Sequence, residues 1–342
     1  MALSAQQFIE QVDRLRSQGL LWFDVAEELG YSDYRSVLRR LQRLKERGYS
    51  VDDYSIDRPP SPHMDAEDLV QHRIKQFNRK KRYEEDRKLI PVHVHLDGPI
   101  GILHFGDPHV DDDGTDLETL RYHSDLTNEI EGLYGANIGD TRNNWVGRLA
   151  RLYAEQSTSE SEALVLAEWF LKRTRWLYLI GGNHDAWSGV DDPIPWIVKE
   201  QNALYESSEV RLGLKFPNGR ECRINARHDF AGHSQWNPAH GVGKSIQLGE
   251  WDDIAICGHK HVSGYMILKS PTDGRVCHAI QIASYKIYDR YARERGFRDQ
   301  AVSPAVVTVI DPYAQTNEGF VTVFHDVEKG VEFLQHLRAK AR

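Results

Sequence analysis

This chain has few cysteines, no long apolar run and no excess of positive charge. The three cysteines, Cys222, Cys257 and Cys277, are too few for a disulfide framework, and each lies in an apolar, strand-like stretch. We therefore expect reduced, buried thiols. No apolar run approaches the roughly 18–20 residues of a membrane span, and the opening MALSAQQFIEQVDRL lacks a signal peptide's apolar stretch. These absences favour a cytoplasmic protein that binds no membrane.

The net charge of −8 argues against a surface that binds nucleic acid non-specifically. Residues 1–90 carry 17 Lys and Arg against 16 Asp and Glu, so the acidic excess belongs to the rest of the chain. Any contact with nucleic acid should therefore be local and salt-sensitive. A length of 342 residues with 40% hydrophobic content supports one large core and a small accessory domain.

Five short clusters of metal-ligand residues each follow an apolar run. In chain order they are Asp107 and His109, then Asp140, then Asn183 and His184, then His228, then His259 and His261. Strands that end in such residues direct them into one crevice, where open α/β sheets carry their sites. The order predicts a phosphoesterase site with two divalent cations about 3.5–4 Å apart that activate a water. Carboxylate and imidazole ligands favour manganese first, with iron or zinc as alternatives.

At these residues the chain resembles the calcineurin-like metallophosphoesterase family, whose pattern is DxH, GD, GNH followed by Asp or Glu, an isolated His, and GHxH. The resemblance spans roughly residues 98–265 and implies two ligand sets that share one carboxylate. The first set is Asp107, His109, Asp140 and His261, and the second is Asp140, Asn183, His228 and His259. It also implies a four-layer α/β/β/α sandwich. His184 would act near the leaving group, as general acid or transition-state stabiliser, and Asp140 would be essential to catalysis.

The isolated histidine has two competitors in its segment, His233 and His240. We favour His228 because it directly follows the alternating strand pattern of residues 222–226. His233 and His240 then become candidates for the substrate side of the crevice, with ordinary loop positions as the alternative.

Two positions depart from the pattern of the family's protein Ser/Thr phosphatases, which have Asp three residues after the bridging carboxylate and Glu at the end of the third motif. Here these positions are Asn143 and Asp185. A neutral Asn side chain would orient the catalytic imidazole less strongly than Asp. This favours the repair nucleases and phosphodiesterases of the family, in which the form GNHD occurs.

Aromatic and cationic residues near the motifs suit a nucleotide, because aromatic faces stack bases and cations hold phosphates. Trp145 is one candidate for stacking, although tryptophan also packs beneath loops. The candidate substrate-binding residues are Arg142, Asn143, Trp187, His233, Trp236 and His240.

The N-terminal region, from Ala5 to about Tyr49, has the pattern of two or three amphipathic helices. Ala26, Leu29 and Gly30 fall where a helix-turn-helix places its small residue, apolar residue and turn glycine, and Ser32 could cap the next helix. That helix would be the recognition helix. Its candidate nucleic-acid-binding residues are Arg35, Arg39, Arg40 and Arg43. A small helical bundle for protein contacts is the alternative.

A linker follows, since RPPSPH at residues 58–63 forbids regular helix. The next stretch looks helical and basic, and Lys80 and Lys81 in it could follow a phosphate backbone or form a solvated face. We expect three parts. They are a helix-turn-helix-like domain at 1–55, a linker and basic helix at 56–90, and a metallophosphoesterase domain at 91–342.

Within the last part, strand-like runs alternate with helical stretches and then give way to a strand-rich half. The strand runs lie near 92–106, 133–139 and 175–181, and the helical stretches near 115–131, 147–173 and 191–206. Asn218-Gly219 and the PTDG at 271–274 predict hairpin turns.

We expect hydrolysis of a nucleic-acid phosphodiester. Two alternatives stay open: a small-molecule phosphatase or cyclic-nucleotide phosphodiesterase, and a DNA-binding or replication and repair accessory protein that uses residues 1–90 to bind nucleic acid or a protein partner. A helix-turn-helix fused to a compact phosphoesterase resembles arrangements in bacteriophage and prophage genomes. This association favours a bacterial cell, with a phage as a source of the gene.

Overall fold

The computed structural model describes residues 3–50, 63–186, 192–234, 236–289, 296 and 299–341. Contacts along the chain divide it into two units, Met1–Gln76 and Phe77–Arg342. Among the helices of the described parts, none is both long enough and apolar enough to cross a membrane.

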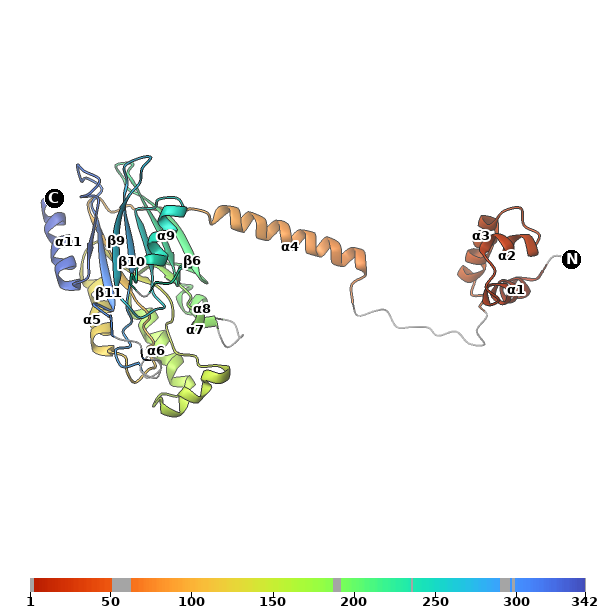
Figure 1. The fold of residues 1–342 in the computed structure, drawn as a ribbon, viewed down its shortest axis with the longest axis horizontal. Coiled ribbons are helices and arrows are strands. Elements are labelled where there is room, and N and C mark those ends of the chain that lie inside the picture. The colour runs from red at the N-terminus through yellow and green to blue at the C-terminus, as the bar shows by residue number, and fades with distance from the viewer. Residues whose placement is uncertain are drawn as a thin grey trace. The chain divides into compact units, whose positions relative to one another are not determined.

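Three short helices form the core of the N-terminal unit (Figure 1). They are α1 (Ala5–Ser17), α2 (Trp22–Glu28) and α3 (Tyr34–Glu46). Their apolar faces meet around Phe8, Val25 and Val37, which are fully buried. Gly30 turns the chain after α2 with a φ of +73°, as the turn-glycine prediction requires. The predicted cap at Ser32 was wrong by one position.

The residue that caps α3 is Asp33, whose side chain accepts the backbone N–H of Ser36 at 3.1 Å. A carboxylate at this position also complements the positive end of the helix dipole, which a serine hydroxyl does not do.

The arginines of α3 fall into two groups. Arg40 donates to the Tyr31 hydroxyl at 2.5 Å and to the Leu3 carbonyl at 3.0 Å, and its guanidinium lies 4.2 Å from the centre of the Phe8 ring. Arg40 therefore fastens α3 to the rest of the unit instead of pointing into solvent. Arg35, Arg39 and Arg43 are exposed and follow one another at intervals of four residues along one face.

Helix α4 (Ala66–Asp86) spans the boundary between the two units and has no buried residue. Its candidate cations Lys80 and Lys81 pair with Glu84 and Glu85 one turn later, at 3.9 and 4.0 Å. Such exposed pairs contribute at most about 1 kcal/mol and leave both lysines accessible. Most of the predicted linker at 58–63 lies outside the described residues.

Two six-stranded sheets form the larger unit (Figure 1). The first sheet, in spatial order, is β1 (Ile90–His93), β6 (Glu209–Lys215), β7 (Glu221–Arg227), β8 (Ile254–Cys257), β10 (Val276–Gln281) and β9 (Gly264–Lys269). The second is β12 (Val321–Phe324), β11 (Ala305–Ile310), β2 (Ile100–Phe105), β3 (Leu133–Asn137), β4 (Trp176–Ile180) and β5 (Leu204–Glu206).

Helices cover the outer faces of both sheets, so the unit has the four layers expected for an α/β/β/α sandwich. The longer helices are α5 (Leu117–Glu129), α6 (Glu160–Arg173), α9 (His240–Leu248) and α11 (Val327–Ala341). The shorter ones are the 3₁₀ segment η1 (Gly147–Glu155), α7 (Asn183–Ala186) and α8 (Ile194–Val198). Figure 1 shows α5 and α11 on the second sheet and α9 on the first. The main core lies between the sheets, and separate apolar clusters lie under the helices.

Most of the predicted helices and strands lie where the sequence placed them. Three predictions need correction. The run 92–106 is two strands in different sheets, because the chain turns at Gly98 with a φ of +92°. The stretch 147–173 breaks into η1 and α6, where Ser159 caps α6 with a capping box. The stretch 191–206 holds the short α8 followed by β5.

Both predicted hairpins are present. Asn218-Gly219 joins β6 to β7, and the PTDG turn joins β9 to β10. Gly219 and Gly274 have φ of +84° and +69°, which glycine adopts without strain. The cysteines lie in β7, β8 and β10 and are free and buried.

Helix α11 should stabilise the sandwich mainly through Leu334, which is fully buried against the second sheet. We expect Leu334→Ala to lower the free energy of unfolding by about 2–5 kcal/mol. The neighbouring exposed Gln335 is the control, and Gln335→Ala should change it by less than about 0.5 kcal/mol. Urea denaturation of the full chain measures both. Equal effects of the two substitutions would contradict this packing.

Candidate metal centre

The ligand motifs follow strands whose carboxyl ends meet at one edge of the sandwich. Asp107 and His109 follow β2, Asp140 follows β3, and Asn183 follows β4; these three strands are parallel neighbours. From the other sheet, His228 follows β7, and His259 and His261 follow β8, which is parallel to β7. Parallel pairing therefore brings residues far apart in sequence to one place.

The first predicted ligand set lies together. His261 Nε2 is 3.3 Å from Asp107 Oδ2 and 3.3 Å from His109 Nε2. His109 Nε2 is in turn 4.0 Å from Asp140 Oδ2. Asp107, His109 and His261 thus form one group that could hold a metal ion.

The second predicted set surrounds the other side of Asp140. His228 Nε2 lies 3.2 Å from Asp140 Oδ2, 3.0 Å from Asn183 Oδ1 and 3.1 Å from His259 Nδ1. Asp140, His228 and His259 form another group suited to a metal ion. The structure brings His228, and neither His233 nor His240, into this group.

The donor atoms fit a bound cation better than they fit one another. Two pairs of imidazole nitrogens face each other at 3.1–3.3 Å, in the pairs His109–His261 and His228–His259. Facing nitrogens attract only if a proton or a metal ion lies between them. The carboxylate atom Asp107 Oδ1 is also buried without a hydrogen-bond partner. Imidazole with carboxylate is the donor set of manganese, iron and zinc.

The ligand loops adopt a backbone conformation that side chains rarely tolerate. His109, Asp140, His259 and His261 have φ of 39°, 51°, 69° and 52°. Left-handed conformations of non-glycine residues cost about 1–3 kcal/mol each and persist where the surroundings enforce them. Main-chain bonds supply that support, since Asp140 accepts the N–H of His109 at 3.0 Å through its carbonyl. Strain concentrated on four proposed ligands is typical of a functional site.

Close packing leaves no room for a side chain at Gly182. A Cβ there would collide with the carboxylate of Asp140 and would lie 2.8 Å from its carbon Cγ. Asp185 holds the same junction, because its carboxylate accepts the N–H of Gly182 at 2.8 Å and that of Thr141 at 3.1 Å. Burial and the charge of Asp140 raise the pKa of Asp185 to about 8.

The charged groups of the site shift one another's pKa. Burial disfavours the ionised Asp140, but the imidazoles of His228, His184 and His109 outweigh it and hold the pKa of Asp140 well below its usual range. Burial likewise opposes protonation of His228, but Asp140 raises its pKa to about 10. His261 is half-buried, and although desolvation opposes its protonation, hydrogen bonds with Asp107 and Asp289 raise its pKa to about 9. At neutral pH these two imidazoles carry protons where a metal ion would otherwise bind.

His184 lies beside this group and is anchored from three sides. Its backbone N–H donates to Asp140 Oδ1 at 2.9 Å, its Nδ1 bonds the carbonyl oxygen of Asn143, and its Nε2 is 3.8 Å from Asp140 Oδ2. The Trp145 ring meets the imidazole edge-on, with centroids 5.0 Å apart. Burial lowers the pKa of His184, so the ring is mainly neutral at pH 7. His109, Asp140 and His184 also lie close enough to form a third potential metal group.

Asn143 does not act as the sequence argument assumed. Its side chain is fully buried and donates to Asp112 at 2.8 Å and to Gln156 at 3.0 Å. The main-chain carbonyl orients His184 instead, so an Asn in place of Asp does not by itself weaken that contact. Burial also removes this side chain from direct contact with a substrate.

The other substrate candidates occupy different environments. Arg142 is only 6% exposed. Burial raises the pKa of Asp192, and the positive charge of Arg142 partly offsets this rise. His233 and His240 are exposed. Trp236 is 94% exposed and could meet a base in solvent. Trp187 lies outside the described residues.

Sequence reasoning missed three residues that support the site. Asp289 Oδ2 lies 3.4 Å from His261 Nδ1, on the ring edge away from the ligand group. Asp112 accepts a hydrogen bond from the Asn143 side chain, and Lys286 forms an ion pair with Asp112 at 2.9 Å. The run of acids at 111–113 was a visible signal for part of this network, but no motif marked Lys286 or Asp289.

Three other histidines, none of them predicted as ligands, are structural. His104 lies between Tyr178 and Thr308, His123 bonds Tyr285, and His278 bonds Tyr265. Burial lowers their pKa, to about 3 for His104. They are neutral core residues at physiological pH.

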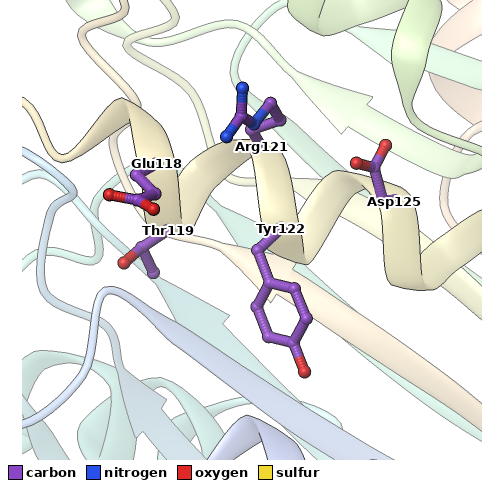
Figure 2. A pocket seen from close by; sticks show the side chains of 5 residues that line it. All are labelled: Glu118, Thr119, Arg121, Tyr122 and Asp125. Atoms are coloured by element: carbon purple, nitrogen blue, oxygen red, sulfur yellow. The ribbon is translucent and has the colours of Figure 1, made fainter.

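A hollow on the outer surface of α5 is separate from the ligand group. Figure 2 shows its lining, which comes from that one helix. The residues are Glu118, Thr119, Arg121, Tyr122 and Asp125. None of them is a proposed ligand.

Comparison with known proteins gives matches only at the level of structure. No protein-family model and no curated protein matches the sequence. The calcineurin-like phosphoesterase YfkN from Bacillus subtilis has a TM-score of 0.36 and 10% identity, over 71% of this chain and 98% of that chain. The resemblance of this chain to calcineurin-like phosphoesterases rests on its ligand motifs and not on this match.

A second solved structure, the NAD nucleotidase NadN of Haemophilus influenzae, has a TM-score of 0.35 and 11% identity. The match covers 66% of this chain and 49% of NadN, so it spans about half the length of that protein. Activity and substrate rest on the ligand group and not on these similarities.

Metal binding should release protons, because His228 and His261 must lose theirs to act as ligands. Their pKa values in the metal-free protein are raised to about 10 and about 9, so affinity for Mn²⁺ should rise with pH through neutrality up to about pH 10. Calorimetry at pH 7.5 in buffers of different ionisation enthalpy should show about two protons released on loading. An affinity independent of pH between 6 and 9 would contradict this arrangement.

Proposed function

We propose that this protein is a metal-dependent phosphoesterase that hydrolyses nucleic-acid phosphodiesters. The observation that carries the proposal is the sharing of Asp140 by two groups of ligands, one with His109 and one with His228 and His259. When bound there, two divalent cations would supply an activated water and neutralise charge on the phosphate.

The protein's own residues would divide the remaining work. Asp140 would fix the spacing of the two ligand sets, since its carboxylate is buried and lies between them. Asn183 and His259 lie toward solvent and would face an arriving phosphate. Gly182 and Asp185 would hold the loop that carries Asp140 against the loop that carries Asn183.

His184 would act at the leaving oxygen. Because a carbonyl oxygen can only accept, Nδ1 must carry the hydrogen in its bond to Asn143, and Nε2 is left as the atom that exchanges a proton. The protonated ring would donate Nε2–H to the departing alkoxide. Burial lowers the pKa of His184, so this protonated form is lost as pH rises.

Support for a nucleic-acid substrate comes from the N-terminal unit. Arg35, Arg39 and Arg43 form an exposed row on α3, at the position of a recognition helix in a helix-turn-helix. Residues 91–342 carry the acidic excess, so a chain that needs to hold a polyanion would rely on such a local row.

The first test is Mn²⁺-dependent hydrolysis of bis-p-nitrophenyl phosphate, p-nitrophenyl phosphate and labelled single- and double-stranded oligonucleotides. We expect the wild type to cleave the diester and the oligonucleotides, and Asp140→Asn to cleave neither because both ligand sets lose their common member. Metal analysis of the two proteins should show the same loss. Turnover of the monoester alone, with oligonucleotides intact, would replace the proposal with a small-molecule phosphatase.

His184→Ala separates metal binding from leaving-group assistance. Metal content should stay unchanged, while the rate on alkyl diesters should fall about 100-fold and the rate on p-nitrophenyl esters much less. The gap between wild type and variant should widen as the pH falls, because the protonated form of wild-type His184 then becomes more populated. Loss of metal from His184→Ala would instead make this histidine a ligand, as its proximity to His109 and Asp140 allows.

The arginine row is tested by Arg39→Glu combined with Arg43→Glu. Oligonucleotide binding should weaken, and the salt dependence of log K should become shallower by about 1 for each phosphate that the protein no longer neutralises. Hydrolysis of bis-p-nitrophenyl phosphate should not change. Arg14→Glu, at an exposed position of α1, is the control for the single variant Arg39→Glu, which makes the same change of charge. Identical effects of Arg14→Glu would exclude a specific role for α3.

A further inference from the structure

The segment that follows β10 is fastened to two loops of the site. The Ser284 hydroxyl donates to the main-chain carbonyl of Asp107 at 2.7 Å, and the N–H of Ile287 donates to that of Gly114 at 2.9 Å. Lys286 lies between these two anchors, and its backbone pairs with Thr115 in an isolated β-bridge. The position of Lys286 is therefore fixed by main-chain contacts on both sides.

The side chain of Lys286 is a buried cation between two carboxylates. Only 5% of it is exposed, and its Nζ lies 2.9 Å from Asp112 Oδ2 and 3.7 Å from Asp289 Oδ1. A buried ammonium group is stable only when anions compensate its charge. A carboxylate shielded from solvent likewise needs a nearby cation. The three groups form one unit in which a single cation is shared by two carboxylates, with a net charge of −1.

One branch of this unit leads to His184. Asp112 Oδ2, which holds Lys286, also accepts the side-chain N–H of Asn143 at 2.8 Å. The Asn143 carbonyl then bonds Nδ1 of His184. A parallel contact runs through Trp145, because Nζ of Lys286 is 4.9 Å from its ring centroid and that ring meets His184.

The other branch leads to His261. Asp289 Oδ2 lies 3.4 Å from His261 Nδ1, while His261 Nε2 faces Asp107 and His109. A carboxylate on the outer nitrogen fixes the ring orientation and leaves the inner nitrogen for a ligand role. Lys286 thus neutralises the carboxylate that orients a proposed ligand.

We propose that Lys286 is a positioning residue that holds His184 and His261 in their working orientations through Asp112 and Asp289. This inference rests on the proposed function, in which the two histidines act on leaving group and metal. Without the cation, Asp112 and Asp289, which are both largely shielded from solvent, repel each other. The loops that carry Asn143 and His261 then lose their common anchor.

The test compares Lys286→Met, which keeps length and removes charge, with Lys286→Arg, which keeps charge. Hydrolysis by the Mn²⁺-loaded enzyme is measured on aryl and alkyl phosphodiesters of increasing leaving-group pKa. With Lys286→Met we expect rates on the poorest leaving groups to fall about 10- to 100-fold, a steeper dependence on leaving-group pKa, and weaker metal binding. Lys286→Arg should lie closer to the wild type on all three measures.

A second readout needs no activity and no metal. In ¹⁵N-histidine NMR of the metal-free protein, the His184 signal, assigned by its loss in His184→Ala, should report hydrogen on Nδ1 in the wild type. Lys286→Met should shift it toward a mixture of tautomers. If the wild type hydrolyses no phosphodiester, the proposed function fails, while this spectrum still decides the positioning role.

The control is Arg211→Met, which removes a cation paired with buried Asp252 at 2.8 Å on the first sheet, away from the ligand residues. It should leave leaving-group dependence and the His184 signal unchanged. If Lys286→Met does not fold, Asp112→Asn breaks the same branch and should reproduce the His184 shift. An unchanged His184 signal in Lys286→Met would overturn the proposal. So would a rate loss in Lys286→Met that is equal on all esters and is also seen in Arg211→Met.

Discussion

The buried carboxylate of Asp140 is the interaction on which the site depends. It is 1% exposed and lies within 4 Å of His109, His184 and His228. Burying an isolated anion costs several kcal/mol, so the imidazoles around it must carry positive charge or hold cations. A proton on His228 meets that need in the metal-free protein, and metal ions would meet it in the loaded one. The same requirement explains why histidines from both sheets converge there.

The rest of the unit keeps these groups in a conformation that they would not adopt alone. Left-handed backbone at four proposed ligands is held by parallel strands on either side and by main-chain bonds from neighbouring loops. Asp185 and Ser284 each join a ligand loop to another segment. Lys286 extends this support by balancing two further carboxylates. The site is therefore rigid because a packed sandwich supports it.

Features set by residues close together in the sequence were predictable, whereas contacts between residues distant in the sequence were not. Sequence reasoning predicted the hairpin turns and the convergence of the ligand residues, because turn glycines and motif spacing are local signals. The family resemblance implied the sandwich. Sequence reasoning did not find Lys286 or Asp289, since Asp112 and His261, which they contact, are distant in sequence and no motif marks them. It assumed that the side chain of residue 143 orients His184, whereas the main chain does. It read Arg40 as a surface cation, although packing on Phe8 is set by tertiary contact.

The central claim is that Asp140 lies between two bound metal ions. Anomalous diffraction from crystals loaded with Mn²⁺ tests it most directly, because it locates each ion independently of activity. The account predicts two peaks about 3.5–4 Å apart, one beside Asp107, His109 and His261 and the other beside Asn183, His228 and His259, with Asp140 in contact with both. A single peak ligated by His184 together with His109 and Asp140, or no peak at this edge of the sandwich, would contradict it.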